Sequence, residues 1–204
     1  VGRVIARPFI GAPGRFERTA RRKDYSMMPP EPTILDHLSG HGVDTIGIGK
    51  IGDIFLEKGI DYSFHDAGNR ACLDRTIDCM KKNNENDQFL FINLVDTDML
   101  YGHRRDIQGY HDAVSYIDSR LEEITGLMSD RDMLIITADH GCDPGFKGTD
   151  HTREHVPLLV VQKQQNGRSF GIRNSFCDVA QSLASFFNVP AMDHGTSFLQ
   201  DQAN

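Results

Sequence analysis

The chain has 204 residues, which is enough for one sizeable domain or for one domain with part of another. Hydrophobic residues make up 39% and charged residues 25% of it, an ordinary globular composition that argues against extensive disorder. The net charge of −7 argues against nucleic acid as the main partner, and no apolar run approaches the roughly 20 residues needed to span a bilayer.

The first 26 residues differ from the rest of the chain because they carry seven Arg and Lys side chains. Pro29, Pro30 and Pro32 follow them and indicate a linker or a domain junction, since proline cannot continue a regular hydrogen-bonded ladder. The basic stretch is either a solvated surface or an arginine-lined wall that holds a phosphorylated substrate. The second function is chemically reasonable because the guanidinium group of arginine can bind phosphate in a bidentate way.

Beyond the prolines, strands and helices are predicted to alternate. In chain order we expect a helix over 32–38, a strand over 43–49, a helix over 71–82, strands over 89–95 and 133–138 on either side of a helix over 107–128, a strand over 156–161, and a helix over 175–187. The longest helix is defined by apolar residues that step by four and three, and the strand over 89–95 by a nearly continuous apolar run. Strands separated by helices predict an α/β fold with a largely parallel sheet.

The four cysteines, Cys72, Cys79, Cys142 and Cys177, include no C-x-x-C pair. Free thiols in a reducing cytoplasm are the favoured interpretation, with disulfides as the alternative. Cys142 lies beside an Asp-His pair, but we expect it to line the pocket without binding a metal, because harder ligands are available there.

Aspartate and histidine gather in three short stretches, at 98–103, 137–141 and 149–152. The first two come directly after predicted strands, and in open α/β sheets sites form beyond the carboxyl ends of strands. A glycine-rich loop could bring the third stretch back over the same edge. Asp and His are the ligand types for hard and borderline divalent cations. The sequence therefore predicts a divalent-metal site suited to phosphoryl transfer.

Each of these residues has a simpler alternative explanation. An aspartate at a strand end often caps the next helix, and Asp96 and Asp106 compete with Asp98 as ligand candidates. His155 competes in the same way with His151. The joint placement of the candidates at one sheet edge favours the metal site. The H-E-x-x-H spacing, the P-loop and the G-x-S-x-G elbow are all absent from the sequence.

Three segments, 95–106, 137–144 and 148–154, resemble the phosphopentomutase family, a bacterial branch of the alkaline phosphatase superfamily. Residues 2–11 and 48–54 are similar to the same family. The string Tyr-Gly-His-Arg-Arg-Asp, within the first segment, separates this family from the cofactor-independent phosphoglycerate mutases.

The resemblance implies an alkaline-phosphatase-like core of three layers with a largely parallel sheet. Residues 27–204 would form the C-terminal part of this metal-binding catalytic core, and residues 1–26 the C-terminal part of a small cap domain. The family's nucleophilic threonine and one aspartate ligand lie upstream of Val1. We therefore expect the chain to be the C-terminal half of the enzyme, to be inactive alone, and to have the missing N-terminal half as its partner.

The resemblance also implies a site for two manganese ions, although Mg²⁺ or Zn²⁺ would suit the ligands by chemistry alone. Asp98, His103 and His151 would hold one ion. Asp139 and His140 would hold the other, together with the upstream aspartate and the phosphothreonine.

The implied activity is the interconversion of ribose 1-phosphate, or its 2-deoxy form, with the 5-phosphate through a phosphothreonine. Arg3, Arg7, Arg18 and Lys50 are the candidate contacts with the pentose phosphate. The alternatives are another phosphatase, phosphodiesterase or phosphoglycerate mutase-like enzyme of the superfamily, or a non-catalytic metal-binding module. Neither nucleic acid nor a membrane is expected as a partner.

Overall fold

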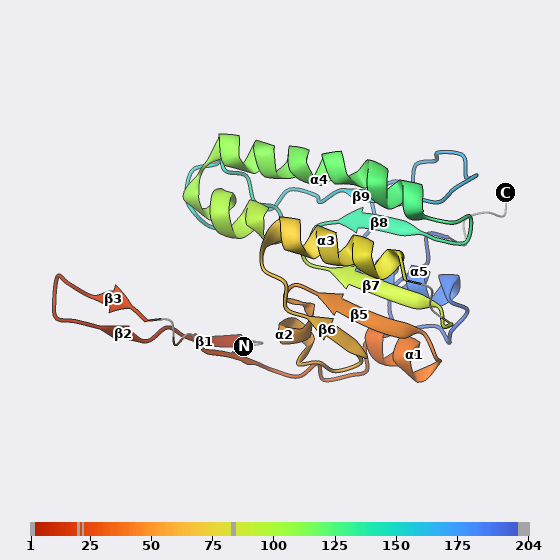
Figure 1. Ribbon diagram of the computed structural model, residues 1–204, viewed down its shortest axis with the longest axis horizontal. Helices are drawn as coiled ribbons and strands as arrows, with labels where there is room; N and C mark the ends of the chain where they lie inside the picture. The colour runs from red at the N-terminus through yellow and green to blue at the C-terminus, as the bar shows by residue number, and fades with distance from the viewer. Residues whose placement is uncertain (1–2, 20, 22, 83–84, 200–204) are drawn as a thin grey trace.

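A computed structural model describes residues 3–199 apart from 20, 22, 83 and 84 (Figure 1). Its centre is a three-stranded parallel sheet, in which β5 (Asp44–Ile48) lies between β6 (Tyr62–Phe64) and β7 (Gln88–Ile92). Parallel strands need crossover connections, and here α2 (Ile51–Phe55) and α3 (Gly68–Met80) supply them. This part of the molecule therefore has the α/β organisation that the sequence predicts.

Helices cover both faces of the parallel sheet. Alternate side chains of a strand point to opposite faces, so Leu90 and Ile92 of β7 pack into the apolar cluster beneath α3. On the other face, Phe91 contacts Phe55 of α2, with ring centroids 6.1 Å apart. The C-terminal end of α5 (Cys177–Phe186) approaches the same face of β7. The described core is thus three-layered, as expected.

A second strand pair extends the architecture. β8 (Leu134–Thr137) and β9 (Leu158–Val161) pair in antiparallel fashion. The described residues 138–157 form no helix, so no crossover is available that could make β9 parallel to β8. Figure 1 shows β8 beside β7 and pointing in the same direction. The strand over 156–161 is therefore correctly predicted, but it runs against the others.

The long helix α4 (Ile107–Leu127) matches its prediction in extent but not in burial. Ile124 and the following Met128 are buried, and Ile124 packs on Leu73 and Ile77 of α3. Val114, which the apolar stripe places on the same face, is 46% exposed. An apolar stripe usually marks a buried face, but here the stripe is fully buried only near the C-terminal end of the helix.

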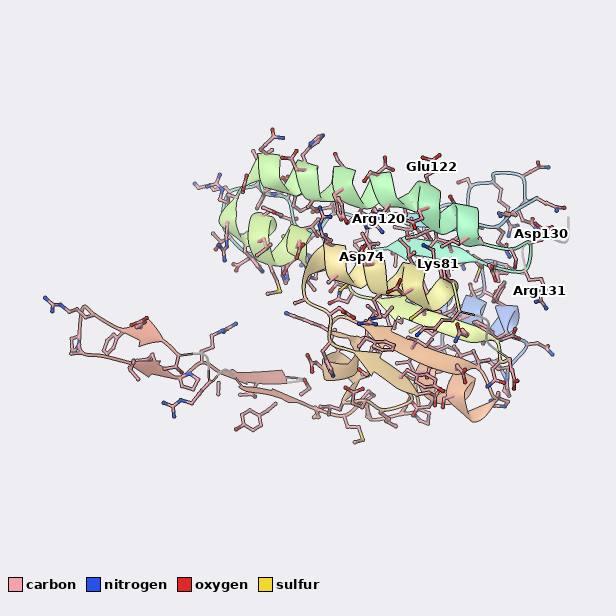
Figure 2. All side chains as sticks on the ribbon, viewed as in Figure 1. Asp74, Lys81, Arg120, Glu122, Asp130 and Arg131 are labelled. Carbon is pink, nitrogen blue, oxygen red and sulfur yellow. The ribbon has the colours of Figure 1, made fainter. Side chains whose placement is uncertain are left out.

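Ion pairs join α3 to α4 at their outer surface (Figure 2). Arg120 of α4 donates to Asp74 at 2.7 Å and to the Tyr116 hydroxyl at 2.9 Å. Lys81, just after α3, donates to Glu123 at 3.1 Å. Asp74, Lys81 and Glu123 are exposed to solvent and Arg120 is partly buried, so the apolar contacts beneath them contribute more to holding the helices together.

The basic N-terminal stretch forms an arm that projects from the core (Figure 1). The arm consists of two antiparallel pairs, β1 (Arg3–Ala6) with β4 (Lys23–Ser26) and β2 (Phe9–Ile10) with β3 (Glu17–Arg18). Phe9 and Phe16 contact one another edge to face near its tip, and both remain largely exposed. After the proline cluster, α1 (Ile34–Gly40) begins the core and contacts β5 and α5.

None of the described helices is long and apolar enough to cross a membrane. All four cysteines are free, as predicted, and three of them are buried.

Candidate metal centre

The predicted ligands come from short segments at the carboxyl ends of β7 and β8 and from the loop that precedes β9. Asp98 lies in a single π-helical turn, Thr97–Tyr101, and His103 in the 3-10 turn that follows it. His140 is the third residue after β8, and His151 lies in the loop before β9. An isolated backbone bridge, Gly141 with Thr152, holds the last two segments together.

Four side chains converge on one point. The Nε2 atoms of His151 and His103 lie 3.1 Å and 3.3 Å from the same carboxylate oxygen of Asp98. The ring of His140 stacks on that of His151, with centroids 3.6 Å apart and 19° between the planes. Asp98, His140 and His151 can each offer a ligand atom such that all three atoms lie within 4.8 Å of one another.

Backbone carbonyls orient two of the imidazoles. Nδ1 of His103 lies 2.5 Å from the Thr149 carbonyl oxygen, and Nδ1 of His140 lies 3.0 Å from that of Gly141. An N–H at Nδ1 that donates to a carbonyl leaves the Nε2 lone pair free to bind a metal. In His103 that lone pair faces the carboxylate of Asp98, which is unfavourable unless a cation or a proton lies between them.

The spacing of these atoms suits a divalent cation. With metal–ligand distances of about 2.0–2.2 Å, neighbouring ligand atoms on one ion lie about 3.0–3.5 Å apart. The two distances from Asp98 to the histidine nitrogens, 3.1 Å and 3.3 Å, fall in this range. A carboxylate with several imidazoles is also a donor set that borderline divalent metals accept. The residues present therefore fit the metal that the sequence predicts.

Asp139 occupies a different position. Its side chain is 80% exposed, and one of its oxygens lies 3.5 Å from Nε2 of His140. It does not belong to the compact group formed by Asp98, His140 and His151. Its carboxylate is thus open to ligands or groups from outside the described residues.

Two of the three residues that competed as candidate metal ligands have structural roles instead. Asp96 accepts a hydrogen bond from the backbone N–H of Asn69 at 2.8 Å at the start of α3. Asp106 caps α4 by accepting from Gly109 N–H at 2.9 Å. His155 is exposed and lies in the same loop as His151. The two aspartates thus behave as helix caps, which separates them from Asp98.

Cys142 is buried beside the ligands, and its Sγ lies 3.5 Å from a carboxylate oxygen of Asp98. Burial, followed by the negative charge of Asp98, raises the pKa of the Cys142 thiol to about 11. Near neutral pH the protonated thiol donates toward Asp98, which agrees with its expected role as a residue that lines the pocket without binding the metal.

The four candidate phosphate contacts are placed unequally. Lys50 lies at the carboxyl end of β5, and its Nζ is 2.9 Å from the Met99 sulfur, next to Asp98. Arg7 is exposed on the arm. The side chains of Arg3 and Arg18 lie outside the described residues. Of the two described candidates, Lys50 is thus the one beside the metal ligands.

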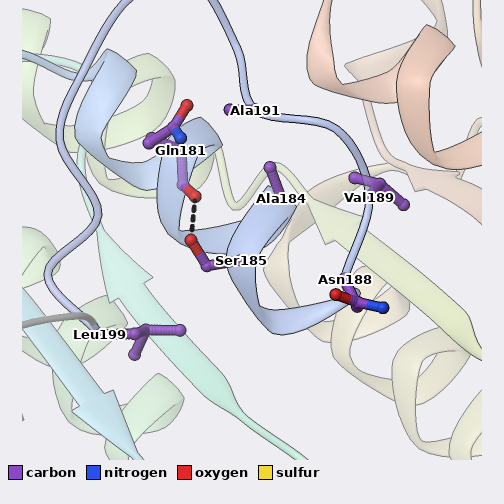
Figure 3. Close-up of a pocket in the computed structure, with 7 residues that line it drawn as sticks. All are labelled: Gln181, Ala184, Ser185, Asn188, Val189, Ala191 and Leu199. Atoms are coloured by element: carbon purple, nitrogen blue, oxygen red, sulfur yellow. Dashed lines mark hydrogen bonds between the residues drawn. The ribbon is translucent and has the colours of Figure 1, made fainter.

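A cavity of about 940 Å³ opens next to the ligand group. Asp139 and His140 line one end of it, and β9 with the loop over 165–176 lines the rest. A smaller hollow of about 410 Å³ lies at the C-terminal end of α5 (Figure 3). There Ser185 donates to the Gln181 carbonyl at 3.0 Å, and no candidate metal ligand lines it.

Two features of the site were missed from the sequence. The Thr149 carbonyl that orients His103 is a backbone group, and no residue pattern reveals it. Gly102 brings the turn that carries His103 against Cys142, so that a Cβ at this position would overlap the thiol sulfur. The position of Gly102 between the two ligands Asp98 and His103 is the sequence feature that could have indicated its role.

Comparison with known proteins identifies the family. The model of a family described as the metalloenzyme superfamily matches residues 14–191, which is most of the chain. The chain belongs to the metalloenzyme superfamily. This membership agrees with a ligand group built from Asp98, His140 and His151.

Within the metalloenzyme superfamily, the chain is similar to curated phosphopentomutases. It is 47% identical over 200 residues to the phosphopentomutase of Aeromonas salmonicida and 50% identical over 202 residues to that of Caldanaerobacter subterraneus. Each match covers 98% of this chain but only 50% or 51% of the relative. The chain thus spans about half the length of these relatives.

Solved structures support the metalloenzyme fold. A phosphoglycerate mutase from Leishmania mexicana, crystallised at low cobalt concentration, matches 80% of this chain with a TM-score of 0.60 and 18% identity. The PH0037 protein from Pyrococcus horikoshii matches 73% of it with a TM-score of 0.54 and 16% identity. At these identities the matches establish the fold alone.

Proposed function

We propose that this chain is the C-terminal half of a phosphopentomutase, a metal-dependent phosphotransferase that interconverts ribose or deoxyribose 1-phosphate with the 5-phosphate. The observation that carries the proposal is the 47–50% identity to phosphopentomutases, which extends over 98% of the chain. The convergence of Asp98, His103, His140 and His151 supports the metal-dependent part of it.

We assign Asp98, His103 and His151 to one ion and Asp139 with His140 to a second. The two short distances from the Asp98 oxygen to histidine nitrogens, 3.1 Å and 3.3 Å, support the first group. The exposed carboxylate of Asp139 supports the second, because it is open to further ligands from the upstream half. Manganese is the proposed metal, and Mg²⁺ or Zn²⁺ would also suit these ligands.

Two such ions would stabilise the attacking and leaving oxygens during in-line transfer of the phosphoryl group between the nucleophilic threonine and the sugar. The residues of this chain would hold the ions and orient the side chains that bind them. The Thr149 and Gly141 carbonyls fix the imidazoles of His103 and His140, and the protonated Cys142 thiol donates toward Asp98.

Binding of the substrate phosphate is assigned to Lys50, Arg3, Arg7 and Arg18. The position of Lys50 beside Met99, which adjoins Asp98, supports its part in this. We also propose that residues 1–26 are the end of a cap domain and residues 27–204 a part of the catalytic core. The projection of the arm away from the core in Figure 1 is consistent with that division.

We propose that the complete enzyme acts in the cytoplasm, in the breakdown of nucleosides, with the missing N-terminal half as the partner of this chain. The four unpaired cysteines are consistent with a reducing compartment.

Calorimetric titration of the chain with Mn²⁺ tests the metal assignment. The wild type should bind the ion, and Asp98→Ala should weaken binding by about 10-fold or more, the size of effect that lost site contacts produce. Asp112→Ala, an exposed aspartate on α4, is the control and should bind like the wild type. Absence of binding by the wild type, or unchanged binding by Asp98→Ala, would contradict the assignment.

An activity assay tests the reaction. The complete protein should convert ribose 1-phosphate to ribose 5-phosphate, whereas this chain alone should not. Conversion of 3-phosphoglycerate in place of the pentose phosphate would favour a phosphoglycerate mutase. Turnover of ribose 1-phosphate by this chain alone would show that the nucleophile lies within it.

A further inference from the structure

Thr152 comes directly after the ligand His151 and bonds to the segment that follows β8. Its backbone N–H donates to the Gly141 carbonyl at 3.0 Å, and its hydroxyl accepts a hydrogen bond from the Asp143 N–H at 2.9 Å. The same hydroxyl donates its proton to the Glu154 carboxylate at 2.8 Å. A threonine hydroxyl has one proton to donate and lone pairs that accept, so these two bonds together fix its orientation.

The Gly141 carbonyl that Thr152 holds also faces the imidazole of His140. Its oxygen lies 3.0 Å from Nδ1 of His140 and accepts from the Thr152 N–H at the same distance. The imidazoles of His140 and His151 stack with their centroids 3.6 Å apart. The position of one ligand relative to the other therefore depends on how Thr152 is held against the segment after β8.

The hydroxyl of Thr152 also closes the loop over 143–152. The hydrogen bond that it accepts spans nine residues of the chain. This loop carries the ligand His151 and the Thr149 carbonyl, whose oxygen lies 2.5 Å from Nδ1 of His103. Because the two ends of the loop meet at the Thr152 hydroxyl, loss of the hydroxyl should displace both groups.

Little regular structure supports this loop. The described residues 138–157 contain no helix and no strand, and the pair Gly141 with Thr152 is an isolated bridge. Such a bridge has no neighbouring ladder hydrogen bonds, so the side-chain contacts beside it are a large part of what holds the two segments together. The Glu154 carboxylate adds to them, since it lies so close to Gly141 that a Cβ there would be 2.4 Å from its carboxyl carbon.

We propose that Thr152 is a positioning residue of the metal centre, and that its hydroxyl keeps His151 and the Thr149 carbonyl in place for metal binding. The inference rests on the proposed function in one respect, namely that His151 binds an ion. Thr152 acts through His151 and not as a ligand, since its hydroxyl bonds to Glu154 and Asp143. Groups that orient metal ligands in this way affect metal affinity although they do not touch the ion.

Calorimetric titration with Mn²⁺ tests the proposal with three substitutions at one position. Thr152→Val keeps the branched shape but removes the hydroxyl, and it should weaken Mn²⁺ binding by about 10-fold or more. Thr152→Ala also lacks the hydroxyl and should weaken binding in the same way, so the result does not depend on the folding of one variant. Thr152→Ser retains the hydroxyl and should bind close to the wild type. Thr125→Val is the control, because it removes a hydroxyl that donates to the Leu121 carbonyl at 2.7 Å within α4.

Two further measurements separate the positioning of ligands from general stability. Urea unfolding in the presence of EDTA compares the metal-free chains, in which Thr152→Val and Thr125→Val should lose stability to a similar extent. The visible spectrum of bound Co²⁺ responds to ligand geometry. At saturation it should change in Thr152→Val and remain that of the wild type in Thr152→Ser and Thr125→Val. A residue that only stabilised the loop would lower the free energy of unfolding without changing this spectrum.

Each outcome decides the matter. If Thr152→Val binds Mn²⁺ as tightly as the wild type, or if Thr152→Ser loses as much affinity as Thr152→Val, the hydroxyl does not position the ligands and the proposal is overturned. Both outcomes leave the proposed function intact, since the wild type still binds the ion. Absence of binding by the wild type would instead refute the metal assignment and this proposal with it. Turnover of ribose 1-phosphate by the complete protein reports separately on the proposed reaction.

Discussion

Gly102 packs directly against the thiol of Cys142, which joins the turn carrying His103 to the segment that follows β8. A Cβ on Gly102 would overlap the sulfur, and it would lie 3.0 Å from the Thr97 carbonyl oxygen. Two of the ligand-bearing segments therefore approach one another as closely as they do because position 102 has no side chain.

Replacing Gly102 should disturb the metal site although Gly102 is not itself a ligand. Gly102→Ala forces the turn and Cys142 apart and should weaken Mn²⁺ binding by about 10-fold or more, because ligand orientation depends on such supporting contacts. The double variant Gly102→Ala with Cys142→Ala removes the sulfur and should recover most of the affinity. Cys142→Ala alone is the control. Calorimetry measures all four proteins, and wild-type affinity in Gly102→Ala would refute the steric argument.

The loop before β9 contains two exposed histidines that form a matched pair. His151→Ala should abolish or strongly reduce Mn²⁺ binding, because Nε2 of His151 lies 3.1 Å from Asp98. His155→Ala should bind as the wild type does, since His155 is outside the compact ligand group. Titration of both variants compares them directly. Equal losses would mean that the loop as a whole, and not one imidazole, determines binding.

His103 and His140 distinguish the two possible compositions of the first site. The ligand assignment proposed above places His103 on the ion held by Asp98 and His151, so His103→Ala should cost more affinity than His140→Ala in the isolated chain. The compact geometry of Asp98, His140 and His151 makes the comparison informative. A larger loss in His140→Ala, measured by the same Mn²⁺ titration, would exchange the roles of the two histidines.

The cysteines should differ sharply in reactivity. Cys177 is exposed, whereas Cys72, Cys79 and Cys142 are buried, and burial raises the pKa values of all three. The thiolate is the reactive form, so a thiol reagent at pH 7.5 should label one cysteine rapidly in the native chain and four in denaturant. Mass spectrometry locates the label. Rapid native labelling of Cys142, whose pKa is raised to about 11, would contradict the structure.

Asp178 at the start of α5 should make stability depend on pH. Burial opposes its ionisation, but hydrogen bonds from Thr196 N–H and Arg173 Nε, both at 2.8 Å, outweigh it, and the pKa of Asp178 is lowered. The native state then binds fewer protons than the unfolded state. The stabilisation is complete above the unfolded pKa, near 4, and is lost as the pH falls through the folded value.

Asp178→Asn keeps the shape of the side chain but removes the negative charge that forms an ion pair with Arg173. At pH 7 it should lower the free energy of unfolding by about 1–3 kcal/mol, the usual cost of losing a charged hydrogen bond in a buried place. The difference from the wild type should shrink below pH 4. Urea unfolding at pH 7 and at pH 3 measures both values, and a difference that grows on acidification would contradict the lowered pKa.

Much of the core could be predicted from apolar patterns. The runs over 89–95 and 133–138 locate β7 and β8, because strands inside a sheet require apolar side chains on both faces. The spacing over 107–128 locates α4 to within a residue, since its 21 residues provide several turns of periodicity. The five-residue α2 and the three-residue β6 were missed because they are too short to show a period.

The residues of the site could be predicted from the sequence, but the orientation of their side chains could not. Placement after strands was enough to bring Asp98 and His140 together, because the carboxyl ends of parallel strands share one edge. The contact from His103 to the Thr149 carbonyl spans 46 residues and uses a backbone atom, so the sequence contains no sign of it. The exposure of Asp139 was likewise unpredictable, because it depends on how the chain leaves β8.

The shared carboxylate of Asp98 also has a consequence for folding. Its histidine neighbours come from turns that are far apart along the chain, so this ligand set cannot exist in the unfolded state. A bound ion would act as a reversible cross-link that closes long loops only after the core has formed. Metal at 100 times its dissociation constant would add about 2.7 kcal/mol to stability and raise the melting temperature, and a chelator would reverse this.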